Sequence, residues 1–204
     1  MKNIRRPAKS IFLSFLAAVF CLCGCHKGKN WALPEQGPPP VVPAGKFDLK
    51  GFYLGMSQED ARRVAPVFCA DLKESASCYG DRQCWIDGMT LAGKKTKTTY
   101  LFFKDNELTA LAVKFPTAEF EHIAAVLNNE YGKAGSTKTE KVRNGFGMPF
   151  EKLEISWKVR DAAVSVSNLY EKVTEGAVEV RPANPSAKFK ACQLLASNKA
   201  KADL

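Results

Sequence analysis

The sequence predicts an α+β domain made of two tandem helix-plus-three-strand units, which form one antiparallel sheet with the helices packed on one face. Three observations support this fold class. Apolar stripes with a helical period begin near residues 57 and 117, strand-like segments follow each of them, and two short turns lie 55 residues apart. A sheet that helices cover on one face buries the apolar surface of both.

The first unit is expected at about residues 47–115 and opens with a strand over 47–54. A helix is predicted to begin at Ser57, because its side chain can accept an unpaired backbone N–H while Asp60 occupies the favoured first turn. The apolar positions of this helix follow the spacing i, i+3, i+4 and i+7: Ala61, Val64, Ala65 and Phe68. Pro66 should kink or end the helix.

The strands expected after this helix are 84–91, 98–104 and 107–115. Asp105-Asn106 is a plausible two-residue hairpin turn, which would place Tyr100 opposite Leu111 and on the same face as Phe102. Both faces of this hairpin are then rich in apolar side chains. One reading is a central hairpin covered by helices on one side and by the tail or tether on the other. The second reading is an exposed patch of Tyr100, Phe102 and Leu111 that contacts a partner.

The second unit is expected at about residues 116–182, where Thr117 is predicted to cap a helix and Gly132 to end it. The apolar stripe of this helix is Phe120, Ile123, Ala124, Leu127 and Tyr131. The strand candidates that follow are 136–143, 151–159, 162–170 and 177–181. Arg160-Asp161 is the second hairpin turn and would place Trp157 opposite Val164 on a half-buried ribbon.

The first 24 residues have the three parts of a secretory signal: a basic start, a twelve-residue apolar run from Ile11 to Leu22, and small residues before a cut. The run is too short to span a bilayer, which takes about 20 residues. Leu22-Cys23-Gly24-Cys25 resembles the lipobox of bacterial lipoproteins. The resemblance implies that Cys25 becomes residue one of the mature chain and bears the lipid. The alternative is an ordinary signal cut elsewhere, or an uncleaved anchor, with Cys25 a free thiol.

The lipobox resemblance also implies a location. His26 follows Cys25, whereas enteric lipoproteins kept in the inner membrane typically have Asp there, so the cell outer membrane on its periplasmic side is expected. Residues 25–46 are rich in Pro and Gly and predict an extended tether. Residues 183–204 form a Lys- and Ala-rich tail, with a short helix expected from Ser186 to about Asn198.

Four cysteines remain once Cys21 and Cys23 leave with the signal and Cys25 is acylated: Cys69, Cys78, Cys84 and Cys192. An even number in an exported chain predicts two disulfides. All three possible pairings tie Cys192 to the region 69–84, and the preferred pairing is Cys69 with Cys192 and Cys78 with Cys84. The set has no Cys-x-x-Cys and no nearby histidine, so no metal site is expected.

Charge and motifs exclude several function classes. The formal charge is +9, and removal of the signal leaves 26 basic and 21 acidic residues, a charge of +5. The lysine clusters lack interleaved aromatic or arginine residues, so no nucleic-acid partner is expected. The sequence has no serine elbow, zinc helix or phosphate loop, and His122 lies on a helix flank, so neither catalysis nor a cofactor is expected.

Leu54-Gly55-Met56-Ser57 and the acidic helix start are similar to the opening of BamE/SmpA-OmlA-type outer-membrane lipoproteins. The doubled order of helix and strands resembles the secreted β-lactamase inhibitor protein. These resemblances imply work by protein contact, which in one case is outer-membrane assembly and in the other enzyme inhibition. The sequence therefore predicts a lipid-anchored, non-catalytic module that binds another envelope protein. The alternative is an inhibitor or ligand-binding module of the envelope.

Overall fold

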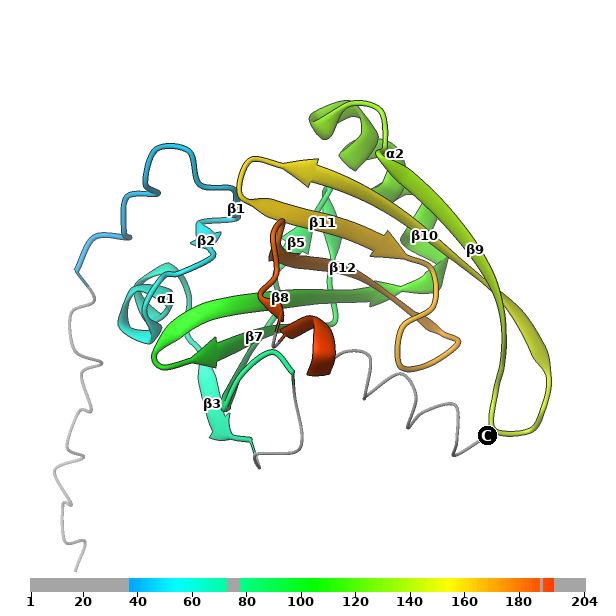
Figure 1. Ribbon diagram of the computed structural model, residues 1–204, viewed down its shortest axis with the longest axis horizontal. Coiled ribbons are helices and arrows are strands. Elements are labelled where there is room, and N and C mark those ends of the chain that lie inside the picture. Colours follow the sequence, from blue (N-terminus) through cyan, green and yellow to red (C-terminus); the bar gives the residue numbers. More distant parts are fainter. Residues whose placement is uncertain (1–36, 73–77, 188, 193–204) are drawn as a thin grey trace, which may run out of the picture. The chain divides into compact units, whose positions relative to one another are not determined.

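The computed structural model describes residues 37–72, 78–187 and 189–192 (Figure 1). These residues belong to one compact unit, 35–204, which contains a single core and both disulfides. A unit with its own core can fold alone, so a chain that begins at Lys27 contains everything that the fold needs. The predicted signal, Cys25 and most of the predicted tether lie outside the described residues.

The main element is an eight-stranded antiparallel sheet in the order β3-β4-β7-β8-β12-β11-β10-β9. Its strands are β3 (Phe68–Asp71), β4 (Arg82–Asp87), β7 (Thr98–Lys104), β8 (Glu107–Pro116), β9 (Ser136–Arg143), β10 (Pro149–Val159), β11 (Ala162–Ser167) and β12 (Glu175–Pro182). Two small ribbons accompany it: β1 (Asp48–Leu49) with β2 (Phe52–Tyr53), and β5 (Thr90–Leu91) with β6 (Lys94–Lys95).

The predicted α+β fold class of two helix-plus-three-strand units is wrong. Strands account for 46% of the structure and helices for 18%, and the fold is mostly β. The chain forms two meanders of four strands each, β3-β4-β7-β8 and β9-β10-β11-β12, which join where β8 pairs with β12. Residues 68–71 form a strand, whereas Phe68 was predicted to belong to the first helix. The first meander therefore has four strands instead of the three that were predicted.

The first helix is shorter than its apolar stripe. Helix α1 spans Gln58–Val64, and the backbone N–H of Asp60 donates to Ser57 Oγ at 3.1 Å, so the predicted cap is confirmed. The chain becomes extended at Ala65, whose φ of −156° suits the residue before a proline. Phe68 therefore leaves the helix face and becomes the first residue of β3.

The second helix begins two residues later than a cap at Thr117 predicts. A short 3₁₀ turn, Thr117–Glu119, precedes α2 (Phe120–Tyr131), and Thr117 does not cap the helix. Its hydroxyl instead donates to the carbonyls of Asn168 (3.0 Å) and Val173 (3.2 Å) in the loop before β12. Gly132 ends the helix with a φ of 79°, as predicted.

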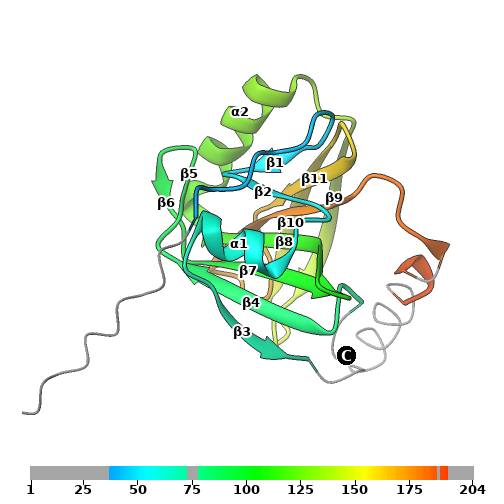
Figure 2. The ribbon, with the colours of Figure 1, turned by 90° about the vertical axis from the view of Figure 1, so that its left-hand side faces the viewer.

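The core lies on one face of the sheet. The apolar face of α2 and the segment from Phe47 to Ala61 share one buried cluster with that face. The largest side chains that are fully buried in it include Phe52, Met56, Leu101, Phe103, Leu108, Phe115, Ile123, Leu127, Val164 and Val166. In two views, α2 and the C-terminal helical turn around Phe189 lie on opposite sides of the sheet (Figures 1 and 2).

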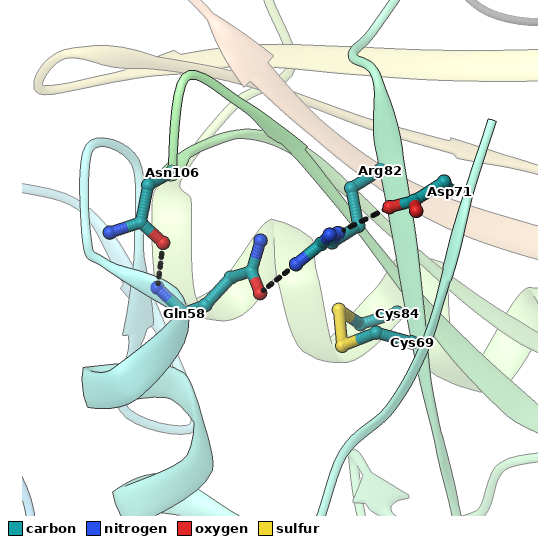
Figure 3. Close-up of a disulfide and its surroundings, with 6 residues drawn as sticks. All are labelled: Gln58, Cys69, Asp71, Arg82, Cys84 and Asn106. Carbon is teal, nitrogen blue, oxygen red and sulfur yellow. Dashed lines mark hydrogen bonds and ion pairs between the residues drawn. A yellow bond between two sulfur atoms is a disulfide. The ribbon is translucent and has the colours of Figure 1, made fainter. Parts of the chain in front are cut away.

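A polar bridge joins α1 to the sheet. Figure 3 shows Arg82, on β4, between Asp71 Oδ1 at 2.7 Å and Gln58 Oε1 at 3.2 Å. The backbone N–H of Gln58 in turn lies 3.4 Å from Asn106 Oδ1 in the turn between β7 and β8. Because both central residues of that turn have positive φ, it is a primed hairpin turn, as Asp105-Asn106 predicted.

Two disulfides are present, but the preferred pairing is wrong. The bonds are Cys69–Cys84 and Cys78–Cys192. Strand β3 explains the difference, because its register with β4 places Cys69 directly opposite Cys84. Cys78 is left for Cys192, which ties the C-terminal segment to the domain as every pairing required. Residues 187 and 189–192 are helical, and the rest of the predicted tail helix lies outside the described residues.

A carboxylate fixes the start of the domain to the second hairpin. Asp161 Oδ1 accepts the backbone N–H of Phe47 at 2.8 Å, and Lys46 Nζ lies 3.0 Å from Asp161 Oδ2. Burial alone would raise the pKa of Asp161, but the Phe47 hydrogen bond and the Lys46 ammonium outweigh it and lower that pKa.

Asp161→Asn is expected to lower the free energy of unfolding by ~1 kcal/mol at pH 7, because the amide keeps an acceptor but loses its charge. Because the pKa of Asp161 is lower in the folded than in the unfolded state, its ionised carboxylate stabilises the fold at pH values above the unfolded pKa of about 4. This stabilisation is lost as the pH falls through the folded pKa. The difference from wild type should therefore shrink below about pH 4 in urea titrations. A constant difference from pH 3 to 7 would contradict this explanation, and Asp105→Asn on an exposed turn is the control.

Candidate interaction surface

In the described part of the chain, no helix packs over the centre of the second face of the eight-stranded sheet, and we call this face the open face. Alternate residues of each strand point to it. Its residues include Phe68, Gln83, Trp85, Tyr100, Phe102, Ala110, Ala112, Lys114, Ser136, Glu154, Ser156, Lys158, Ala163, Ser165, Ser167, Ala177, Glu179 and Arg181.

One row of this face crosses all eight strands. From β3 to β9 it reads Phe68, Trp85, Tyr100, Ala112, Glu179, Ser165, Ser156 and Ser136. The row changes in chemistry as it crosses the sheet: three aromatic residues are followed by a small residue, Ala112, then by the carboxyl of Glu179, and finally by three serines. The open face thus has an aromatic half on β3, β4 and β7 and a serine-rich half on β11, β10 and β9.

The aromatic half is well ordered. The Phe68 and Trp85 rings are stacked with centroids 6.3 Å apart, and Trp85 pairs with Tyr100 on the next strand. Phe68 is 61% exposed although it is a large apolar residue. Trp85 and Tyr100 are half-buried. An accessible aromatic stripe of this kind on a rigid sheet is typical of protein-binding surfaces.

The C-terminal segment covers one edge of the aromatic half. Tyr79 lies over Phe102 with ring centroids 5.1 Å apart, and Phe189 meets the other side of Tyr79 at 5.4 Å. The Cys78–Cys192 disulfide holds these two segments together. The C-terminal segment thus covers Phe102, as the first reading of the hairpin expected, while Phe68, Trp85 and Tyr100 keep some access to solvent. Contact of this hairpin with a partner stays a prediction.

A cationic centre adjoins the aromatic half. Lys114 on β8 is 6% exposed, and its ammonium lies 5.0 Å from the Tyr100 ring centroid and 5.5 Å from that of Tyr170. It pairs with Glu171 and lies 3.6 Å from Glu175 Oε2. Burial lowers the pKa of Lys114, but the two carboxylates outweigh burial and raise it. The ammonium is charged and fixed, which orients the Tyr100 ring.

A second charged pair lies on β12. Glu179 and Arg181 both point to the open face, and Arg181 Nη2 lies 3.5 Å from Ser165 Oγ. Burial raises the pKa of the Glu179 carboxyl, although Arg181 opposes this. Burial also lowers the pKa of Arg181, but Glu179 and Tyr79 reverse the effect and raise it. The open face therefore has a carboxyl and a guanidinium next to each other on β12, between its aromatic and serine-rich halves.

The residues predicted to contact a partner do not all share this face. Tyr100 and Phe102 do, but Leu111 lies in the core and is 2% exposed. The β7–β8 ladder shifts register between Phe102 and Phe103, so Tyr100 pairs with Ala112 rather than with Leu111. A β-bulge inserts one residue and moves every following side chain to the other face. The predicted Tyr100–Leu111 pair is therefore wrong.

Thr109 is the extra residue of this bulge. Its hydroxyl lies 2.9 Å from the carbonyl oxygen of Phe102 and also contacts the carbonyl of Tyr79. These contacts fix the strand irregularity and the segment that carries Tyr79 at the same point. The bulge thus places Tyr79 over Phe102, which the sequence pattern gave no means to predict.

A cavity of about 690 Å³ opens beside the Cys78–Cys192 disulfide. Its walls include Tyr79 and Phe189 as apolar surfaces and Asp81, Lys104 and Thr109 as polar ones. Among the described residues, no group of three or more His, Cys, Asp or Glu side chains could hold a metal ion. No helix in the described part of the chain is long and apolar enough to cross a bilayer.

No protein-family model matches the chain, and searches of curated proteins and of solved structures give no significant match. The open face is therefore interpreted from its own residues. Phe68, Trp85, Tyr79 and Phe189 were not among the predicted contacts. The alternation of residues 82–87 could have placed the Trp85 side chain on the face of the strand away from Cys84. Phe68, however, was assigned to a helix, and Tyr79 lies in no periodic pattern.

Proposed function

We propose that this chain is a lipid-anchored protein of the bacterial cell envelope that binds another protein through the aromatic half of its open face. Cys25 bears the anchor in this proposal, and the domain faces the periplasm from the outer membrane. The role is non-catalytic. The observation that supports it best is the ordered aromatic row, in which Phe68 is 61% exposed and stacked on Trp85 beside Tyr100.

Several features favour a protein partner over a small molecule at this row. It runs across three strands, β3, β4 and β7, rather than around one point, and Phe68 at its end is 61% exposed. Aromatic residues at the centre of a contact provide most of the binding energy in protein interfaces, and a polar rim excludes water. Here the cations of Lys114 and Arg181 border the row and can set the orientation of a partner.

A photocrosslinker at position 68 tests the proposal. With p-benzoylphenylalanine in place of Phe68, the full chain in envelope preparations is expected to form one predominant adduct. Tyr100→Ser in the same chain should lower the adduct yield at least tenfold, because an aromatic anchor of about 1.4 kcal/mol or more is lost. The melting temperature should change little, since Tyr100 is only half-buried.

Two controls accompany this experiment. The same crosslinker at Val41, which is 90% exposed away from the sheet, should give no predominant adduct. Lys158→Ser, on the serine-rich half of the open face, should leave the yield from position 68 unchanged. Equal adducts at positions 41 and 68, or an undiminished yield in Tyr100→Ser, would argue against a partner on the aromatic half.

The cavity beside Cys78–Cys192 favours one alternative, an inhibitor or ligand-binding module. A small ligand in this cavity would raise the melting temperature of the purified chain, and inhibition would give an adduct with a released enzyme rather than a resident envelope protein. Intact mass of the membrane-extracted chain tests the anchor separately. A chain that begins at acylated Cys25 lacks the mass of residues 1–24 and gains that of its fatty acids.

A further inference from the structure

A two-stranded arm extends beyond the sheet and ends in an exposed apolar turn. Strand β10 pairs with β9 from Pro149 onward, but with β11 only from Glu154 to Val159. Residues 139–153 therefore form a hairpin arm with no third strand, and Figure 1 shows it running past the ends of β11 and β12. Asn168 holds the base of the arm through hydrogen bonds with Leu153 N (2.8 Å) and Glu151 O (3.0 Å).

The turn at the end of the arm is built around one side chain. Asn144 Oδ1 accepts the backbone N–H groups of Phe146 (3.0 Å) and Met148 (2.9 Å). The Asn144 N–H donates to Met148 O at 3.0 Å, and Gly147 N donates to Asn144 O at 2.8 Å. Four hydrogen bonds fix the five-residue turn, so the orientation of its side chains is set by the backbone.

This ordered turn presents apolar side chains to solvent. Phe146 is 94% exposed and Met148 is 58% exposed. Val142 and Phe150, which lie opposite each other on the two strands, continue the apolar surface below the turn. Large apolar residues held outward by a hydrogen-bond network, at the end of an arm whose turn does not belong to the core cluster, indicate a contact surface.

The charge around the turn favours an anionic lipid surface. The arm, residues 139–153, has three cations, Lys141, Arg143 and Lys152, and two carboxylates, Glu140 and Glu151, for a net charge of +1. Glu151 lies opposite Lys141 and Glu140 opposite Lys152, which leaves Arg143 as the charge without an opposite carboxylate and the one closest to the turn. An apolar tip with a cation directly behind it matches the sequence of depths in a bilayer, where acyl chains lie beneath anionic headgroups.

We propose that this turn is a bilayer-contact site, in which Phe146 and Met148 enter the interfacial region while Arg143 and its neighbouring lysines contact anionic phospholipid headgroups. The inference rests on the proposed anchor for proximity only. Gly37, the first described residue, is twelve positions after Cys25, a length of chain that can span at most ~43 Å, so the anchored domain stays close to the bilayer. A second membrane contact would then limit the orientations in which the open face meets its partner.

In the experiment that tests this proposal, the domain is attached to vesicles through a tag instead of through an acylated Cys25. A chain that begins at Lys27 is attached through an N-terminal hexahistidine tag to nickel-chelating lipid, in vesicles of phosphatidylglycerol and phosphatidylcholine with shallow brominated phospholipid. Phe146→Trp is compared with Thr139→Trp, which lies on the same arm in an exposed position of β9. The emission of Trp31, Trp85 and Trp157 is subtracted with the parent chain.

The added emission in Phe146→Trp should be quenched at least twofold more than that in Thr139→Trp, and less so when phosphatidylglycerol is absent. Equal quenching at positions 139 and 146 would overturn the proposal, as would protection of position 146 only after addition of an envelope protein. Because the tag replaces the acyl chains, these results do not depend on Cys25. If the crosslinker at position 68 gave no adduct, the proposed protein-binding role would be refuted, but the quenching results and the bilayer contact would be unaffected.

Discussion

Gly176→Ala is expected to destabilise the domain by about 3 kcal/mol, because an added methyl group has no room on β12. A Cβ at this position would lie 2.6 Å from Phe115 Cζ and 2.6 Å from the carbonyl oxygen of Ser167. Phe115 is fully buried and pairs with Gly176 across β8 and β12, where the two meanders join. Neither the ring nor the ladder can move without disturbing the core.

Thermal unfolding followed by circular dichroism measures this effect. For a domain of this size, ~3 kcal/mol corresponds to a fall in melting temperature of roughly 6–12 °C. Gly145→Ala is the matched control, since a Cβ there meets no atom within 4 Å, and its melting temperature should stay near that of wild type. An equal fall in melting temperature for both variants would show that crowding against Phe115 and Ser167 does not decide the result.

A second substitution separates the two obstacles. Phe115→Leu removes the ring atoms closest to the added methyl but leaves the Ser167 carbonyl in place. In the Gly176→Ala background its cost should therefore be smaller than in wild type, with a coupling energy of about 1 kcal/mol. Full additivity would mean that the Ser167 carbonyl alone opposes the methyl group.

The sequence was most informative where local patterns decide structure. Ser57 with Asp60, the stripe of α2 and Gly132 are local signals, and the cap, the buried face and the helix end follow them. The Arg160-Asp161 hairpin also has its predicted register, because Trp157 lies opposite Val164 and alternation leaves only one buried face.

The errors arise where non-local pairing decides structure. Phe68 continues the helical spacing of Ala61 and Val64, but Pro66 ends the helix before it. Phe68 then begins strand β3, which is stabilised by its pairing with β4. Once β3 is missed, the opposition of Cys69 and Cys84 is missed too, and the disulfide pairing goes wrong with it. The bulge at Thr109 has no local signal, so it moved Leu111 from the open face to the core.

The candidate surface was therefore predicted in part. Tyr100 and Phe102 belong to it because alternation from the Asp105-Asn106 turn is correct on β7, which precedes the bulge. Phe68 and Trp85 come from strands whose neighbours the sequence does not specify. A row across a sheet is a property of register between distant segments, whereas periodicity describes one segment at a time.

Replacement of both Cys78 and Cys192 by Ala is expected to lower the free energy of unfolding by as much as ~4–5 kcal/mol, the larger of the two disulfide effects. The bond joins residues 114 apart, whereas Cys69–Cys84 spans 15 residues, for which the chain-entropy estimate is about 3 kcal/mol. Paired substitution leaves no free thiol to exchange with the remaining disulfide.

The decrease in the free energy of unfolding will be smaller if the C-terminal segment detaches from the folded domain, because the released segment then gains conformational entropy in the folded state and not only in the unfolded state. Hydrogen exchange measured by mass spectrometry distinguishes the two cases. The amides of Phe189 and Lys190, which now donate to Ser186 Oγ and Ser186 O, should exchange at least tenfold faster in the variant if the segment detaches.

Detachment would also change the open face. Phe189 would leave Tyr79, and the Tyr79 ring would no longer be held over Phe102, so the aromatic half would gain accessible surface at that edge. Amides of β11 and β12 should keep their protection, since their ladder does not involve the segment. Rapid exchange throughout β11 and β12 would instead show that Cys78–Cys192 supports the whole sheet rather than the cover over Phe102.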